Sequence, residues 1–152
     1  MDYAASLSRL QRLCSKAEYC SADVYRKALK DLDGDASQAA QLVSCLVEEH
    51  YVDDARYAAA FAREKASLQG WGPIKIRVQL RAKGVSDDAI DAGLSEVDAA
   101  RASERLERLL AAKARTLEGD PQRRLKLLKF ALSRGYEYGP VEEALQNLEN
   151  RA

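Results

Sequence analysis

Apolar residues recur every three or four positions along most of the chain, and polar residues fill the positions between them. This spacing places the apolar side chains on one face of an α-helix, whereas half-buried strands would alternate with a period of two. Alternating runs of β-branched residues are hard to find in the sequence. The pattern predicts an all-α fold with helices over residues 4–19, 21–32, 36–50, 53–69, 72–83, 86–96, 98–117, 120–134 and 138–150.

Short polar residues and prolines mark the starts of several of these helices. A serine or aspartate side chain at the N-cap accepts a hydrogen bond from one of the unpaired N–H groups of the first turn. A proline at the first helical position has no N–H that would be left unpaired. The expected caps are Ser21, Asp53, Ser86 and Asp120. The prolines that open helices are Pro73, after Gly72, and Pro121, after Asp120.

Two glycines indicate an internal repeat. Segment 84–94 (GVSDDAIDAGL) matches segment 135–145 (GYEYGPVEEAL) in its first glycine and in three apolar positions. Gly84 and Gly135 are predicted to end a cationic helix in the left-handed conformation, and a weaker N-terminal copy has Asp33 at this position. We therefore predict three tandem three-helix repeats over 1–50, 51–97 and 98–152, which form an elongated, curved helical array.

The formal net charge is zero, but the charge is unevenly distributed. Residues 63–83 carry six cations and one anion, and residues 101–134 carry ten cations and four anions. The segment between them, 84–100, carries five anions and no cation. Net neutrality disfavours a protein that binds nucleic acid over its whole surface. Separate basic segments favour a charged surface with a defined orientation.

Two predicted helices carry the basic residues that we single out. Arg77 and Arg81 lie one turn apart without an acid between them, and such a like-charged pair destabilises an isolated helix by roughly a few tenths of a kcal/mol. Either the acidic segment that follows or an external anionic partner compensates, and the sequence leaves both open. The other helix has no acid between 121 and 136. The candidate partner-binding residues are Lys75, Arg77, Arg81, Lys83, Arg123, Arg124, Lys126 and Lys129.

Residues for catalysis or metal binding are scarce. His50 is the single histidine, and the three cysteines lack the CxxC spacing of a zinc site. Adjacent Asp53 and Asp54 are explained by capping and by the helix dipole. We expect no enzymatic activity, no metal and no cofactor. Because no run of about 18 apolar residues exists and the cysteines are odd in number, we expect a reduced cytoplasmic protein without a membrane span.

Residues 48–94 resemble the RecX family of bacterial recombination regulators. One signature is VDDARYA at 52–58 with Phe61, and the other is GPxxIRxxLxxxGV at 72–85. The segment DPQRRLKLLKFALSRGY, followed by VEEAL, looks like the C-terminal repeat of that family. The signature residues to which we assign structural roles are Asp53, Asp54, Arg56, Phe61, Gly72, Pro73, Leu80 and Gly84.

The resemblance implies a non-enzymatic partner of the RecA recombinase. Proteins of this family bind in the groove of the RecA filament on single-stranded DNA, and they restrain its ATPase and strand exchange in recombination, DNA repair and the SOS response. Some also bind DNA, so single- or double-stranded DNA is a further candidate partner. We expect a monomer. The alternatives are a helical DNA-binding module and a helical-repeat scaffold for another protein.

Overall fold

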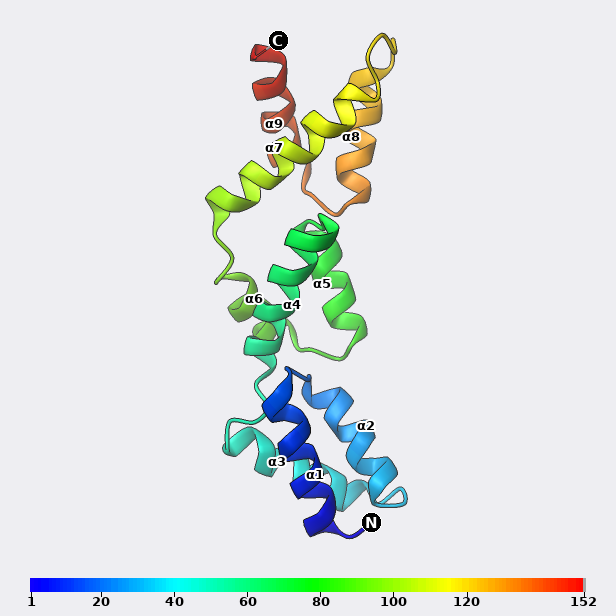
Figure 1. Ribbon diagram of the computed structural model, residues 1–152, viewed down its shortest axis with the longest axis vertical. Coiled ribbons are helices and arrows are strands. Elements are labelled where there is room, and N and C mark those ends of the chain that lie inside the picture. Colours follow the sequence, from blue (N-terminus) through cyan, green and yellow to red (C-terminus); the bar gives the residue numbers. More distant parts are fainter. Residues whose placement is uncertain (152) are drawn as a thin grey trace. The chain divides into compact units, whose positions relative to one another are not determined.

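The computed structural model describes residues 1–151, and every regular element in that range is an α-helix (Figure 1). The all-α prediction is therefore confirmed, and each predicted helix is present with both ends within three residues of their expected positions. No helix in the described range combines the length and apolar character needed to cross a membrane. The helices are α1 (Tyr3–Lys16), α2 (Ser21–Asp31), α3 (Ala36–Glu48), α4 (Asp54–Gln69), α5 (Pro73–Ala82), α6 (Asp87–Leu94), α7 (Ala99–Arg115), α8 (Arg123–Ser133) and α9 (Tyr138–Asn150).

Two of the expected helix starts are confirmed by their capping bonds. Asp53 accepts a hydrogen bond from the N–H of Arg56 at 3.1 Å, at the start of α4. Ser86 accepts one from the N–H of Ala89 at 3.2 Å, at the start of α6. Both bonds satisfy an N–H group that has no partner within the helix.

Two other capping residues were predicted wrongly. Cys20 is the N-cap of α2, and Ser21 is its first helical residue. The N–H and the hydroxyl of Ser21 donate to the carboxylate of Asp54, at 2.7 and 2.6 Å, so a side chain 33 residues away replaces the local cap. At α8, the Asp120 carboxylate accepts from an N–H in a turn, and the helix begins only at Arg123. The proline after Asp120 thus stands in a turn before the helix.

The three helices α2, α5 and α8 end in the same left-handed cap. Gly84 has φ +85°, Gly135 has φ +93° and Asp33 has φ +54°. The N–H of the residue after each one donates to the carbonyl five residues earlier, at 2.8 to 3.3 Å. This bond is the hallmark of the Schellman motif, and an aspartate is one of the few side chains that tolerate its backbone. The shared cap supports the division into three repeats, which stays a prediction.

The chain packs as two compact units, with boundaries inside α4, inside α5 and at the last residue of α6. The first unit comprises Met1–Ala60 and Leu80–Gly93, and the second comprises Phe61–Gln79 and Leu94–Ala152. Each unit has a hydrophobic cluster of its own. Both units therefore bury apolar surface independently of each other.

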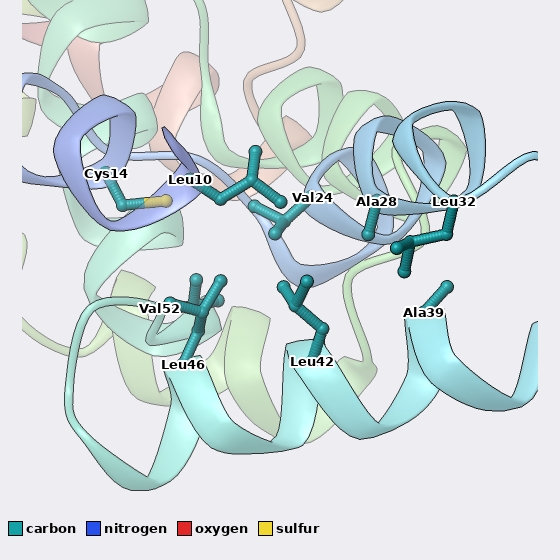
Figure 2. Close-up of a cluster of buried hydrophobic side chains, with 9 residues drawn as sticks. All are labelled: Leu10, Cys14, Val24, Ala28, Leu32, Ala39, Leu42, Leu46 and Val52. Atoms are coloured by element: carbon teal, nitrogen blue, oxygen red, sulfur yellow. The ribbon is translucent and has the colours of Figure 1, made fainter. Parts of the chain in front are cut away.

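The core of the first unit lies among α1, α2 and α3. Figure 2 shows Leu42 and Leu46 of α3 pointing toward Leu10 of α1 and Val24 of α2. All four side chains are fully buried. Burial of such a side chain stabilises the fold by roughly 1.5 to 3 kcal/mol, so these contacts hold the three helices together.

The core of the second unit lies among α7, α8 and α9. Leu106 and Leu110 come from α7, Leu127 from α8, and Val141 and Leu145 from α9. Each is at most 3% exposed. The spacing of three or four residues within each helix supplies the buried face that the sequence pattern predicts.

In the second unit, the start of α5 abuts the end of α8, a contact that we call the α5–α8 junction. The N–H of Gly72 donates to the carbonyl of Arg134 at 2.7 Å, and the N–H of Ile74 donates to the carbonyl of Gly135 at 2.9 Å. Pro73, between the two donors, has no N–H. The unpaired N–H groups at the start of one helix thus satisfy the unpaired carbonyls at the end of another, and the two helix dipoles attract each other.

The junction leaves no room for a side chain at either glycine. A Cβ atom added to Gly72 would lie 2.5 Å from the carbonyl of Gly135, and one added to Gly135 would lie 2.4 Å from the Cβ atom of Lys75. A looser form of this contact occurs in the first unit, where a Cβ added to Gly84 would lie 3.1 Å from the Cβ of Ala22. The end of α5 thus meets the start of α2.

We predict that Gly72→Ala lowers the free energy of unfolding by roughly 2 to 3 kcal/mol, because the added methyl group overpacks the junction. Gly139→Ala is the matched control, since a Cβ there meets nothing within 4 Å. The control is expected to be neutral or stabilising by up to about 1 kcal/mol, because alanine favours helices. Urea denaturation followed by circular dichroism measures both. Equal stabilities for the two variants would contradict the junction.

Candidate partner-binding surface

The signature residues at the start of α4 form contacts within the first unit. Arg56 donates to the carbonyl of His50 at 3.2 Å and pairs with Glu18 at 2.5 Å. His50 itself has φ +64°, which ends α3 in a left-handed cap. Asp53 caps α4, and Asp54 binds the start of α2. These contacts connect the ends of three helices.

The remaining signature residues belong to α5 and its surroundings. Leu80 is fully buried, and Phe61 packs on Trp71 with ring centroids 6.3 Å apart in a tilted arrangement. Gly72 and Gly84 provide the close approach and the left-handed cap described above. These side chains fix where α5 begins, where it ends and which face it buries.

Acidic residues outside α8 pair with two of its four candidate cations. Arg124 pairs with Glu142 at 2.5 Å and Glu149 at 2.7 Å, both on α9, and Lys126 pairs with Asp120 at 2.5 Å. The hydrogen bonds from Arg124 lower the pKa of Glu142, and the hydrogen bond from Lys126 lowers the pKa of Asp120. The sequence correctly excludes an acid between 121 and 136, but the fold supplies acids from elsewhere.

The other two cations of α8 differ in their surroundings. Arg123 donates to the carbonyl of Ala114 at 3.2 and 3.1 Å, and so connects the start of α8 to the end of α7. Lys129 is exposed and has no ion pair with the described residues. Of the four, Lys129 is therefore the residue whose charge is most available to a partner.

The candidate cations in and after α5 also differ in their surroundings. Arg81 pairs with Asp87 of α6 at 2.7 Å, so its charge is compensated by the acidic helix that follows. The ammonium group of Lys75 lies 4.8 Å from the centroid of the Trp71 ring. Arg77 and Lys83 are half-buried. Exposed ion pairs contribute little to stability, so a partner can replace the acid that Arg81 contacts.

The helices α5 and α8 expose aliphatic side chains beside their cations. Ile74 and Leu125 each lie ten residues before the glycine that ends their helix, and they are 47% and 46% exposed. Val78 is 54% exposed and Leu132 is 41% exposed. Spacings of three and four residues place each set on one side of its helix. We call them the α5 face (Ile74, Arg77, Val78) and the α8 face (Leu125, Leu128, Lys129, Leu132).

Sequence reasoning identified the cations of these faces and missed their aliphatic residues. The available signal was an excess of apolar residues on α5. Ile74, Ile76, Val78 and Leu80 alternate along the helix, and a single buried stripe accommodates only half of them. Ile76 and Leu80 are buried, which leaves the other two outside.

Comparison with known proteins identifies relatives over most of the chain. A family model described as "RecX, second three-helix domain" matches residues 53–94. The regulatory protein RecX of Salmonella paratyphi A is 23% identical over 154 residues, which cover 95% of this chain and 92% of the relative. The same protein of Salmonella arizonae is 24% identical with the same coverage.

Two solved structures share the fold. One, described as the crystal structure of regulatory protein RecX, has a TM-score of 0.81 at 24% identity, and the match covers 95% of this chain and 71% of that one. The crystal structure of RecX from Lactobacillus salivarius has a TM-score of 0.86 at 19% identity and covers 97% and 96%. The family model and the relatives support the same family, and the two structures show that the fold is shared.

We predict that Leu125→Ala and Leu127→Ala differ sharply in stability, although the substitution is the same and the sites are two residues apart. Leu127 is 3% exposed, and its truncation is expected to cost roughly 2 to 5 kcal/mol. Leu125 is 46% exposed, and its truncation is expected to change stability by no more than about 0.5 kcal/mol. Thermal unfolding of the two variants measures the difference. A cost at Leu125 similar to that at Leu127 would show that the α8 face is part of the core.

Proposed function

We propose that this chain, which belongs to the RecX family, binds the RecA filament on single-stranded DNA and restrains its ATPase and strand exchange. The role of a regulator agrees with the relatives, which are named regulatory proteins. The filament as the partner and inhibition as the effect are our proposal. In this account the chain is a binding protein, and it performs no chemical step itself.

The composition of the α5 and α8 faces is the observation that carries the proposal. Their exposed side chains are the aliphatic residues Ile74, Val78, Leu125 and Leu132 and the cation Lys129, whereas Arg77 and Leu128 are half-buried. Aliphatic surface gains free energy when it is buried against another apolar surface, at about 25 cal/mol per Å². A phosphate backbone provides no such surface, whereas an acidic protein surface with apolar patches satisfies both kinds of side chain. The faces therefore favour a protein partner over bare DNA.

The repetition of the faces suggests how binding restrains a filament. The two faces occupy equivalent repeat positions within one unit. A filament presents identical subunits at regular intervals, so two equivalent faces can contact equivalent surfaces on neighbouring subunits. A chain that bridges two subunits resists the movements between them that ATP hydrolysis and strand exchange require.

The first test is a titration of the chain into RecA, single-stranded DNA and ATP, with ATP hydrolysis as the readout. We expect a saturable loss of ATPase activity. The control is the same titration into labelled DNA without RecA, followed by fluorescence anisotropy. Tight binding to bare DNA with a steep salt dependence would instead support a helical DNA-binding module. Unchanged ATPase activity together with no DNA binding would support a scaffold for another protein.

We predict that the double variant Arg77→Glu/Arg81→Glu inhibits the RecA ATPase at least about tenfold less well, because reversed charges repel an acidic partner. Circular dichroism is expected to show unchanged helicity. The matched control is Arg101→Glu/Arg108→Glu, which makes the same change in net charge at two exposed positions of α7. The control is expected to inhibit normally.

Replacing Arg81 removes a cation and also breaks its ion pair with Asp87. The variant Asp87→Asn separates these two effects. It removes the acid that pairs with Arg81 but keeps the arginine. Full inhibition by this variant would show that the cation matters rather than the ion pair. Full inhibition by the folded Arg77→Glu/Arg81→Glu variant would remove these two residues from the contact.

A further inference from the structure

Two adjoining cavities open in the second unit, where the starts of α5, α7 and α9 lie near one another. The smaller cavity has a volume of about 160 Å³, and the larger one has a volume of about 270 Å³. Pro73, Ala102 and Tyr136 line both, so the two cavities adjoin along these residues. All of the lining residues belong to the second unit. The two cavities therefore form one space within a single compact unit.

The smaller cavity is enclosed, and most of its wall is apolar. Except for Pro73, each of its lining residues is buried or half-buried. Alanine and aliphatic side chains, with Ile76 and Val97 among them, make up most of the wall. An apolar cavity of about 150 Å³ is large enough to bind benzene. The larger cavity adds space beside it, next to Leu106 and Pro140. This enclosed space suits a small molecule rather than the broad surface of a folded protein.

Three side chains in the wall of the smaller cavity carry hydrogen-bond donors. They are the indole of Trp71, the guanidinium of Arg105 and the phenol of Tyr136. None of these side chains forms a hydrogen bond or an ion pair with the described residues. Arg105 is half-buried without an acid, whereas the more exposed Arg81 and Arg124 each pair with a carboxylate. The cavity thus presents donors and a positive charge without acceptors.

Tyr136 points most clearly to a ligand. The residue is only 6% exposed, and its hydroxyl has no partner among the described residues. No fully buried side-chain oxygen in the described range lacks a hydrogen bond, so this hydroxyl keeps some accessible surface. Because Tyr136 lines both cavities, we infer that this surface faces them. Burial raises the pKa of Tyr136, so the hydroxyl keeps its proton and can donate it in a hydrogen bond.

We propose that the two cavities bind a small amphipathic carboxylate, whose apolar body has about six to ten carbon atoms. Its carboxylate accepts hydrogen bonds from Trp71, Arg105 and Tyr136 in the smaller cavity, since a guanidinium matches the geometry of a carboxylate. Its apolar body fills the remaining space and extends into the larger cavity. Glu137 lines the larger cavity and is exposed, and it repels a carboxylate there. The charges therefore fix the orientation of the ligand.

The test uses the intrinsic fluorescence of Trp71, the only tryptophan of the chain. The full chain is titrated with octanoate, 1-octanol and octylamine, each below the concentration at which it forms micelles. We expect a saturable change in emission with octanoate, and binding at least about tenfold weaker for the other two, which lack the carboxylate. Thermal unfolding is an independent readout, because a ligand that binds only the folded chain raises the unfolding midpoint. Octanoate is expected to raise it.

Three variants connect the signal to the cavity. Arg105→Gln removes the charge and is expected to weaken octanoate binding at least about tenfold, with 1-octanol binding unchanged within about twofold. Arg101→Gln is the matched control, since this exposed residue lies one turn earlier on α7 and lines neither cavity. The control is expected to bind octanoate normally. Tyr136→Phe is expected to weaken octanoate binding about fivefold without loss of stability, because the hydroxyl has no partner within the described chain.

Three results would overturn the site. One is an emission and an unfolding midpoint that octanoate leaves unchanged in the unaltered chain, which requires no variant to fold. Another is equal binding of octanoate and 1-octanol, which would show an apolar cavity without a contact to the carboxylate. The third is octanoate binding by the folded Arg105→Gln variant that equals that of Arg101→Gln. No residue of the α5 or α8 face lines the cavities, so these results do not depend on the filament contact.

Discussion

The contact between the N–H groups that begin α5 and the carbonyls that end α8 is the constraint on which the second unit depends. The ends of a helix leave polar backbone groups unpaired, and burial of such groups without a partner is costly. In this unit the two ends pair with each other at 2.7 and 2.9 Å. The pairing requires glycine at 72 and at 135, because a Cβ at either position would collide with the opposite backbone or with Lys75. Pro73 fits between the two donors because it has no N–H.

This constraint determines which residues of α5 remain available for function. With its start held at the junction, α5 buries Ile76 and Leu80 and leaves Ile74 and Val78 exposed beside Arg77. The same packing positions Lys75 over Trp71 and Arg134 near Gln69. A motif rich in glycine and proline thus acts as a structural element. The helices that it positions carry the surface that we assign to the RecA filament.

The local features of the fold followed from the sequence because they depend on residues close together in the chain. Periodicity and caps sufficed for the helices, and the glycine positions sufficed for the ends of α5 and α8. The features that depend on distant residues did not follow. Ser21 looked like a cap, but its partner is Asp54. Arg124 looked unpaired, but α9 supplies Glu142 and Glu149.

The exposed aliphatic residues show a different limit of sequence reasoning. Because apolar residues alternate along α5, the pattern could not indicate which half of them is buried. The cation–aromatic contacts were missed for a related reason. Lys113 and Phe130 meet only when α7 and α8 pack together, and Lys65 and Trp71, six residues apart, meet through the turn that follows α4. Charge counted along the sequence identified basic segments, but the fold decides which of those charges are compensated.

The most direct test of the proposed filament contact is site-specific photocrosslinking to RecA filaments assembled on single-stranded DNA. A benzophenone amino acid replaces Leu132, which is 41% exposed on the α8 face. The control replaces Arg108, an exposed residue of α7. We predict crosslinks to RecA from position 132, few from position 108, and none from either without the filament. Crosslinks from position 108 alone, or from position 132 to DNA but not to RecA, would contradict a protein-binding α8 face.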